Sequence, residues 1–169
     1  VNISLDTLCA ETYERLARRG RLTEALDGVA AAQRAGMSPV KINAVLMRNV
    51  NEHEAPELLH WALENACDLR FIEQMPLDAD HGWTRENMVT AAQIRESLSQ
   101  DFDLAPDTAP RAGAPAEKFL VRRKAEDRVV GTVGIIASVT EPFCEDCTRT
   151  RITAEGHVRS CLFSHHETD

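Results

Sequence analysis

The sequence predicts an α/β fold, with parallel β-α units over residues 1 to about 105 and a small antiparallel β region after them. Three observations support this prediction. β-prone runs alternate with helical stretches in the first part, a proline-rich segment interrupts the alternation, and two β-prone runs joined by a polar turn follow. Strands separated by helices need crossover connections, which produce a parallel sheet. Three such strands are too few to close a barrel, so an incomplete barrel or an open sheet is expected.

The expected parallel strands lie at residues 1–6, 40–47 and 69–75. Lys41 and Asn43 are two positions apart in the second run, so they fall on one face of the sheet. In sheets of this kind, functional side chains gather at the carboxyl ends of the strands. The candidates in or just after the three runs are Ser4, Asp6, Lys41, Asn43, Arg70, Glu73 and Met75.

Helical periodicity fills the segments between these strands. The first helix is expected to end at Gly20, and a second, with apolar residues at positions 22, 26, 29 and 30, at Gly36. Two capping boxes are predicted at the start of later helices, Asn51 with Glu54 and Thr90 with Gln93. The apolar stripes of these two helices comprise Leu58, Leu59, Ala62 and Leu63 in one, and Ile94, Leu98 and Phe102 in the other.

The segment 105–115 holds three prolines and predicts a boundary between domains 1–105 and 106–169. Beyond it, the runs 118–123 and 128–137 predict an antiparallel pair of strands around a polar turn at 124–127. Gly131 and Gly134 lack the spacing and the Lys-Ser/Thr ending of a phosphate-binding loop. These glycines are therefore expected to permit a bend or a close approach of the backbone.

Charge and cysteine content limit the classes of function. The 19 basic and 27 acidic residues give a formal net charge of -8, which argues against non-specific binding to nucleic acid. Five cysteines are an odd number for a disulfide framework, so a reducing compartment such as the cytoplasm is expected. No apolar run reaches the roughly 18 residues that span a membrane. The chain starts inside a strand pattern without a methionine, which predicts that an amino-terminal part, with any targeting signal, is missing.

Cys144, Cys147 and Cys161 have the spacing C-x2-C-x13-C, which is typical of metal ligands. Three thiolates suit an iron-sulfur cluster with one open iron. They also suit a zinc ion whose fourth ligand is His165, His166 or a substrate. A third interpretation is a reduced, unliganded pair together with a buried core cysteine.

Arg149 and Arg151 follow the second cysteine and alternate along an expected short strand. Both guanidinium groups can then face one side and grip phosphate oxygens in bidentate fashion. In so acidic a chain, surface salt bridging is the alternative interpretation. Their position beside Cys147 favours recognition of an anion that approaches the metal.

Four blocks of the chain carry a family resemblance. They are residues 1–8 (VNISLDTL), 40–45 (VKINAV), 70–77 (RFIEQMPL) and 141–163, which contains the three cysteines. In this order they resemble the GTP 3',8-cyclase family of radical S-adenosylmethionine enzymes, which performs the first step of molybdenum cofactor biosynthesis. The resemblance is weakest from about residue 78 to 125. It implies the second part of an incomplete TIM-like (β/α) barrel, followed by an antiparallel region that holds a substrate-binding 4Fe-4S cluster.

The resemblance also implies roles for individual residues. The ligands of the cluster that binds the guanine base are matched by Cys144, Cys147 and Cys161. Residues that contact GTP are matched by Lys41, Arg149, Thr150 and Arg151, and residues that line the S-adenosylmethionine site by Ser4 and Met75. We add Arg70 to the expected phosphate contacts.

The family reaction begins when a 5'-deoxyadenosyl radical removes the ribose 3' hydrogen, and the resulting carbon radical attacks guanine C8. The chemistry is that of the cofactors, and the protein orients and shields the reactants. The chain lacks the family's C-x3-C-x2-C loop, which holds a second 4Fe-4S cluster, and its tail ending in two glycines. The resemblance therefore implies a fragment that does not cleave S-adenosylmethionine alone, and it is compatible with a homodimer. The rival hypotheses are a zinc-stabilised Cys3His binding module without catalysis and a different radical enzyme that binds a peptide.

Overall fold

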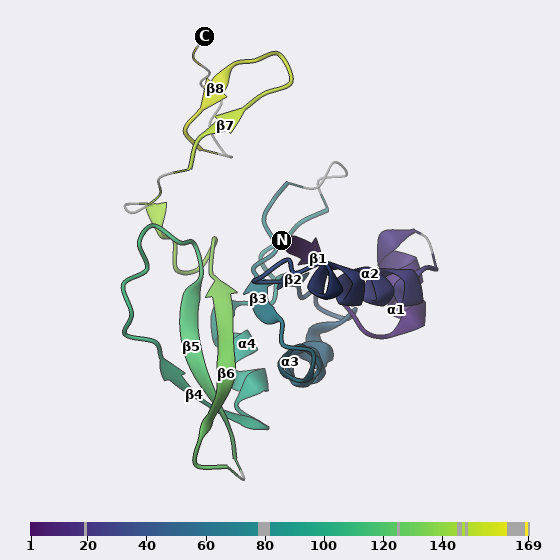
Figure 1. Cartoon of the computed structure of the whole chain (residues 1–169). Helices are drawn as coiled ribbons and strands as arrows, with labels where there is room; N and C mark the ends of the chain where they lie inside the picture. The colour runs from purple at the N-terminus through teal and green to yellow at the C-terminus, as the bar shows by residue number, and fades with distance from the viewer. Residues whose placement is uncertain are drawn as a thin grey trace.

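The computed structural model describes residues 1–18, 20–77, 82–124, 126–144, 147, 149–161 and 168. Within them the chain forms one large sheet with four α-helices and a small hairpin toward the carboxyl terminus (Figure 1). The helices are α1 (Ala10–Ala17), α2 (Leu22–Arg34), α3 (Ala55–Glu64) and α4 (Ala91–Leu98), and a short 3-10 turn, η1 (Glu52–Glu54), precedes α3. No helix of the described residues is long and apolar enough to cross a membrane.

The large sheet has six strands in the order β1-β2-β3-β6-β5-β4. Their bounds are β1 Asn2–Ser4, β2 Lys41–Val45, β3 Asp68–Ile72, β4 Phe102–Pro106, β5 Glu117–Arg123 and β6 Val129–Ile136. Strands β1, β2, β3 and β6 are parallel, and β5 and β4 continue the sheet in antiparallel fashion. The predicted parallel strands and the predicted β5–β6 pairing are confirmed. The sheet is nevertheless mixed, because β6 also pairs with β3.

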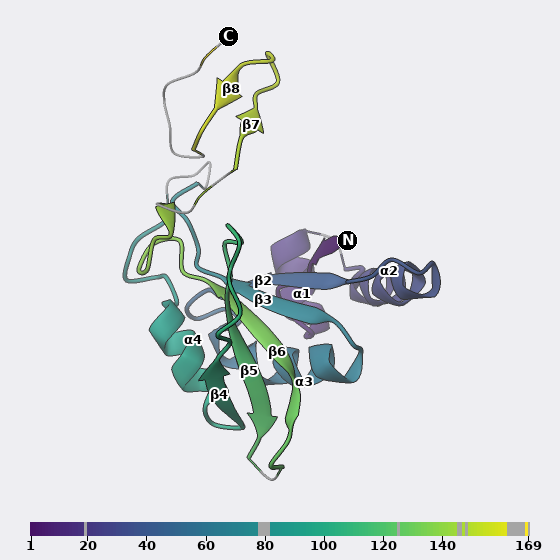
Figure 2. The same cartoon turned by 60° about the vertical axis from the view of Figure 1, so that its left-hand side comes forward.

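One face of this sheet is packed on helices α3 and α4, which also contact each other (Figure 2). Successive residues of a strand point to opposite faces, so β3 buries Leu69 and Phe71 while Arg70 and Ile72 lie on the other face. On β6, the register pairs Leu69 and Phe71 with residues 133 and 135, which are also buried. The face opposite α3 and α4 therefore carries the polar side chains that the sequence singled out in β2 and β3.

The two predicted capping boxes have different outcomes. The Thr90–Gln93 box is confirmed, since the Thr90 hydroxyl accepts from the Gln93 amide and the Gln93 side chain accepts from the Thr90 amide. The Asn51–Glu54 box is wrong, because neither side chain caps a helix. Asn51 bonds to the backbone at the ends of β1 and β2, and Glu54 accepts a hydrogen bond from Thr7.

Several element bounds differ from the prediction. Helix α4 ends at Leu98, so Phe102 is not a helical residue but the first residue of β4, where it is buried. Strands β2 and β3 end at Val45 and Ile72, earlier than predicted, which places Glu73 and Met75 directly after β3. The predicted boundary at residue 105 falls inside β4, and the sheet continues across it. The division into two domains stays a prediction.

The expectation for the glycines of β6 is confirmed. A Cβ atom at Gly131 would collide with the side chain of Leu63. At Gly134 it would lie 3.1 Å from the Cβ of Ala116 and 3.2 Å from the Cγ of Arg70. The missing side chain at Gly134 leaves room for Arg70 to lie across the neighbouring strand.

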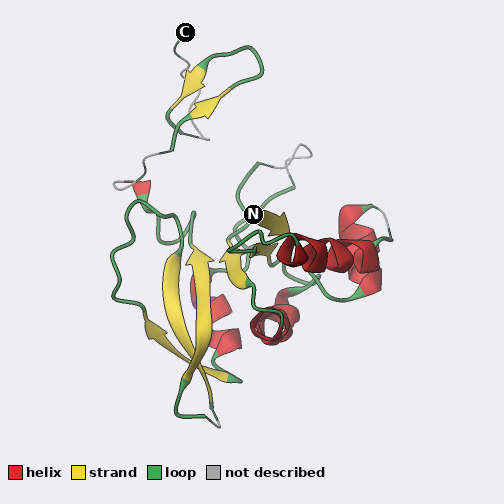
Figure 3. Cartoon of the chain, in the orientation of Figure 1, coloured by secondary structure: helices red, strands yellow, loops and turns green. Residues whose placement is uncertain are grey.

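The small sheet consists of β7 (Arg151–Ile152) and β8 (Val158–Arg159), an antiparallel pair. Figures 1 and 2 show this hairpin projecting away from the large sheet, and Figure 3 shows that the connection from β6 is mostly loop. A long loop without regular structure is a common place for binding residues. Cys144 and Cys147 lie in this connection, and Cys161 follows β8.

Candidate metal and substrate site

The three cysteines and both arginines line one cavity of about 440 Å³ beyond the carboxyl ends of β3 and β6. The wall from the large sheet is apolar and includes Ile72, Met75 and Ile136. The residues from the loop and the hairpin are Ser138, Pro142, Phe143, Cys144, Cys147, Arg149, Arg151, Ser160 and Cys161. The structure thus brings together residues that are up to 89 positions apart in sequence, from Ile72 to Cys161.

The cysteines surround the cavity without meeting at a point. The amide of Cys147 donates to the carbonyl of Cys144 at 3.2 Å, which closes the turn between the first two thiols. Within the described part of the chain, no three His, Cys, Asp or Glu side chains converge closely enough to hold a single metal ion. All five cysteines are free thiols. His165 and His166, the predicted alternative ligands of a zinc ion, lie outside the described residues.

Arg149 contacts the second cysteine directly, with its Nε 3.4 Å from the Cys147 Sγ. The pKa of Cys147 lies below its usual range, first because the Arg149 backbone amide bonds to the sulfur, then because the Arg149 side chain does. Desolvation opposes these two hydrogen bonds, and the positive charges of Arg149 and Arg151 make smaller contributions that lower the pKa further. The thiolate is the form that binds a metal, so this environment makes Cys147 a chemically suitable candidate ligand.

Phe143 contacts two arginines, of which Arg149 lines the cysteine cavity and Arg111 does not. The guanidinium of Arg149 lies 5.0 Å from the centre of the Phe143 ring, and that of Arg111 lies 5.8 Å from it. Both distances are within the range of cation–π attraction. Sequence reasoning missed Arg111, which belongs to the proline-rich segment, because no local pattern links it to residue 143.

Lys41 and Arg70 lie in a second cavity of about 180 Å³, together with Lys118. The structure does not bring them into one cavity with Arg149 and Arg151. Lys41 is the first residue of β2, so it lies at the amino end of that strand and not at its carboxyl end. Lys118 was not predicted as a site residue.

The two cavities follow each other along the same face of the sheet. Arg70 is in register with Gly134 beside the second cavity, and Ile72 is in register with Ile136 beside the first. Two residues along a strand correspond to about 7 Å. The residues of β3 that line the two cavities are therefore neighbours on one face of the sheet.

The remaining candidates are dispersed. Ser4 is exposed at the end of β1, where it pairs with Asn43 of β2. The Oδ1 atom of Asn43 is buried and has no hydrogen-bond partner among the described residues. Thr150 is exposed and lines neither cavity. Burial raises the pKa of Asp6, although the Val45 amide donates to its carboxylate.

A mixed α/β sheet that ends in an arginine-flanked, cysteine-lined cavity defines an α/β protein with a candidate metal site. The chain belongs to the Molybdenum Cofactor Synthesis C family, which matches residues 67–169. Residues 1–62 match the Radical SAM superfamily.

Curated relatives match the whole chain. It is 62% identical to GTP 3',8-cyclase of Paenarthrobacter nicotinovorans, over 100% of this chain and 49% of the relative. It is 55% identical to GTP 3',8-cyclase of Streptomyces coelicolor, over 100% of this chain and 48% of the relative. It is 50% identical to GTP 3',8-cyclase of Mycolicibacterium smegmatis, over 100% of this chain and 46% of the relative. The chain spans about half the length of the curated relatives it matches.

Proposed function

We propose that this chain forms the GTP-binding part of a radical S-adenosylmethionine enzyme that converts GTP to (8S)-3',8-cyclo-7,8-dihydroguanosine 5'-triphosphate in molybdenum cofactor biosynthesis. The observation that carries the proposal is the shared cavity, in which three cysteines of spacing C-x2-C-x13-C face two arginines. Identity of 62% to a GTP 3',8-cyclase over the whole chain supports the same function.

The residues around the cavity fit a 4Fe-4S cluster held by Cys144, Cys147 and Cys161. A cluster distributes its ligands over separate irons, so the sulfurs do not have to converge on one point. The low pKa of Cys147 favours the thiolate, and the apolar wall from β3 and β6 limits access of water. When bound, such a cluster supplies an iron with an open position that ligates the guanine base.

The cations are proposed to hold the triphosphate. It carries about four negative charges, and guanidinium groups bind phosphate oxygens through strong, charge-assisted hydrogen bonds. Arg149 and Arg151 flank the cysteines, and Thr150 lies between them. Lys41 and Arg70 lie further along the same sheet face, so they contribute only if the ligand extends from the first cavity toward the second.

Two parts of the chain are proposed to surround this site. Residues 1–105 supply β/α units of an incomplete TIM-like barrel, and residues 106–169 supply the region that carries the cluster. Ser4 and Met75 line the S-adenosylmethionine site, and Met75 also borders the cysteine cavity. A second 4Fe-4S cluster that cleaves S-adenosylmethionine, a cytoplasmic location and a homodimer complete the proposed enzyme.

Anaerobic purification followed by iron and sulfide analysis tests the cluster. We expect about four irons and four sulfides per chain, with the visible absorption of an iron-sulfur protein. The full-length cyclase of Paenarthrobacter nicotinovorans serves as the positive control. A colourless chain with about one zinc and no sulfide would refute the cluster and leave a zinc-stabilised binding module. Calorimetry with GTP and with an unrelated peptide then separates a cyclase from another radical enzyme.

A further inference from the structure

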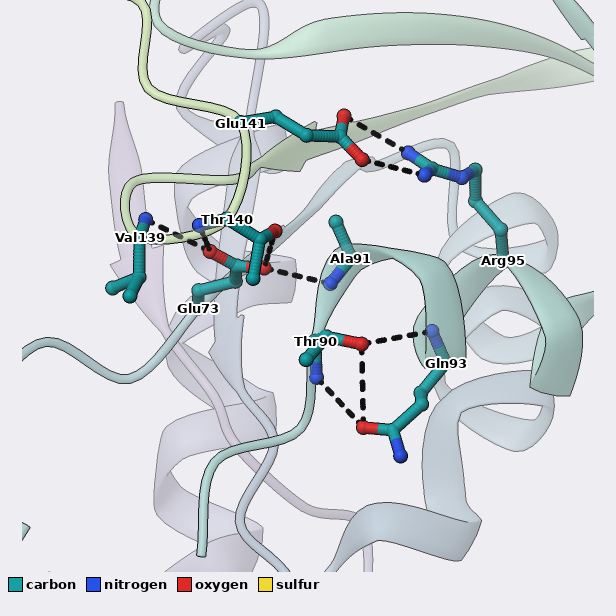
Figure 4. A network of polar contacts seen from close by, with 8 residues as sticks. All are labelled: Glu73, Thr90, Ala91, Gln93, Arg95, Val139, Thr140 and Glu141. Atoms are coloured by element: carbon teal, nitrogen blue, oxygen red, sulfur yellow. Dashed lines mark hydrogen bonds and ion pairs between the residues drawn. The ribbon is translucent and has the colours of Figure 1, made fainter. Parts of the chain in front are cut away.

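Glu73 follows β3 directly and is fully buried, with 0% of its surface exposed. Figure 4 shows its carboxylate surrounded by donors from two other parts of the chain. Oε1 accepts from the Ala91 amide at 2.7 Å and from the Thr140 hydroxyl at 2.5 Å. Oε2 accepts from the Val139 and Thr140 amides, both at 2.9 Å. No cation of the described residues contacts this carboxylate, so these four hydrogen bonds replace its hydration.

These bonds join three segments that meet beside the cysteine cavity. Ala91 is the first residue of α4, where unpaired amides and the helix dipole favour a negative charge. Val139 and Thr140 form the turn after β6, shortly before Pro142, Phe143 and Cys144, which line the cavity. Ile72, the residue before Glu73, lines the same cavity from the end of β3. Glu73 thus connects the strand and the loop segment that line the cavity to the start of α4.

The backbone of Glu73 and a neighbouring ion pair strengthen the same junction. The Glu73 amide donates to the carbonyl of Ile136 at 3.1 Å, which extends the β3–β6 pairing by one bond. The Arg95 guanidinium of α4 donates two hydrogen bonds, of 2.6 and 3.3 Å, to the Glu141 carboxylate (Figure 4). That pair is partly exposed, whereas Glu73 is not. A buried carboxylate satisfied by fixed donors holds its geometry more firmly than an exposed ion pair.

We propose that Glu73 is a positioning residue for the cysteine cavity: its carboxylate fixes the turn at 139–140, and with it the start of the Cys144 segment, against the ends of β3 and α4. The inference rests on the proposed cluster for its functional meaning. It predicts that loss of the carboxylate alters how the cysteines hold the cluster, beyond any loss of overall stability.

Glu73→Gln is the discriminating variant because it keeps the shape of the side chain. In one orientation of the new amide, its NH2 group faces the Ala91 N–H, and in the other it faces the N–H groups of Val139 and Thr140. An NH2 group cannot accept a hydrogen bond, so at least one bond is lost in either orientation. In the anaerobically reconstituted 169-residue chain, we expect iron to be lost to a chelator about tenfold faster and the electron paramagnetic resonance spectrum of the reduced cluster to change. Glu141→Gln, the matched control on the exposed pair, should change the rate by less than about twofold.

Thr140→Val provides a second variant should Glu73→Gln fail to fold. It removes only the hydroxyl bond, so iron loss should be about threefold faster. Unchanged iron loss and an unchanged spectrum in a folded variant would overturn the proposal and leave Glu73 a purely structural residue. If the unaltered chain holds no cluster, the proposed function fails, and hydrogen exchange in the metal-free chain then decides the role of Glu73. Compared with the unaltered chain, Glu73→Gln must show faster amide hydrogen exchange at Ala91, or at Val139 and Thr140. Unaltered exchange rates at all three amides would again overturn the proposal.

Discussion

Asn51→Ala is expected to destabilise the fold strongly, because one buried amide side chain ties the ends of two strands together. Asn51 is 0% exposed. Its Oδ1 accepts from the Met47 amide at 2.7 Å, and its Nδ2 donates to the carbonyls of Asp6 at 2.7 Å and Val45 at 3.0 Å. These carbonyls follow β1 and end β2, at the edge where parallel sheets place their ligands.

The magnitude follows from the three hydrogen bonds. Each is worth about 1 kcal/mol net, and alanine leaves one N–H and two C=O groups, all partly buried, without this partner. The expected loss is therefore about 3 kcal/mol, which lowers the melting temperature by roughly 6 to 12 °C in a chain of this size. Asn51→Asp should lower the free energy of unfolding by at least as much, because it replaces the Nδ2 donor, which faces two carbonyls, with an acceptor.

Urea unfolding followed by circular dichroism measures this loss of free energy of unfolding. Asn87→Ala is the matched control, since Asn87 is exposed and its side chain forms no hydrogen bond with the described residues. It should change the free energy of unfolding by less than about 0.5 kcal/mol. A loss below about 1 kcal/mol for Asn51→Ala would refute the hydrogen-bond argument and show that these strand ends are held by packing.

Three further predictions concern the site and its support. Cys161→Ser should sharply lower the iron content of the reconstituted chain, because an alkoxide is a poor substitute for a thiolate, whereas full iron retention would remove Cys161 from the ligands. Arg151→Ala should weaken binding of GTP by about 2 to 5 kcal/mol but hardly affect binding of guanosine, and Arg151→Lys should recover part of the loss. Calorimetry measures both ligands, and equal losses for GTP and guanosine would exclude a phosphate contact. The hydrogen bond from Arg95 holds the pKa of Glu141 below its usual range. The ion pair therefore stabilises the fold above a pH of about 4.3 and ceases to do so as the pH falls through the lower, folded pKa. Melting temperatures of Glu141→Gln and the unaltered chain should differ slightly at neutral pH and converge in acid, and a difference independent of pH would contradict this.

The capping boxes show where sequence prediction succeeds and where it fails. Thr90 and Gln93 form the predicted box because each finds its partner three residues away on the exposed surface. Asn51 and Glu54 have the same spacing, but the ends of β1 and β2 offer partly buried backbone groups that need partners. Those groups compete successfully for the buried Asn51 side chain, since a polar group that is shielded from water and unpaired costs more than an uncapped helix end.

The candidate site also has features that the sequence predicted and features that it could not predict. The spacing of Cys144, Cys147 and Cys161 predicted a metal site, and these three residues do line one cavity. The sequence could not predict that Arg111 would lie over Phe143, or that Lys41 would lie in a different cavity from Arg151. Both depend on how distant strands and loops pack.

The sequence by itself determined the alternation of strands and helices, the β5–β6 pairing and the choice of candidate metal ligands. These depend on side-chain chemistry and on partners a few residues apart. Only the tertiary structure decided that β6 lies beside β3 and that Glu73 bonds to residues 66 and 67 positions further along the chain. The physical reason is that a buried carboxylate must find donors wherever packing places them, and no local pattern encodes which distant amides those will be.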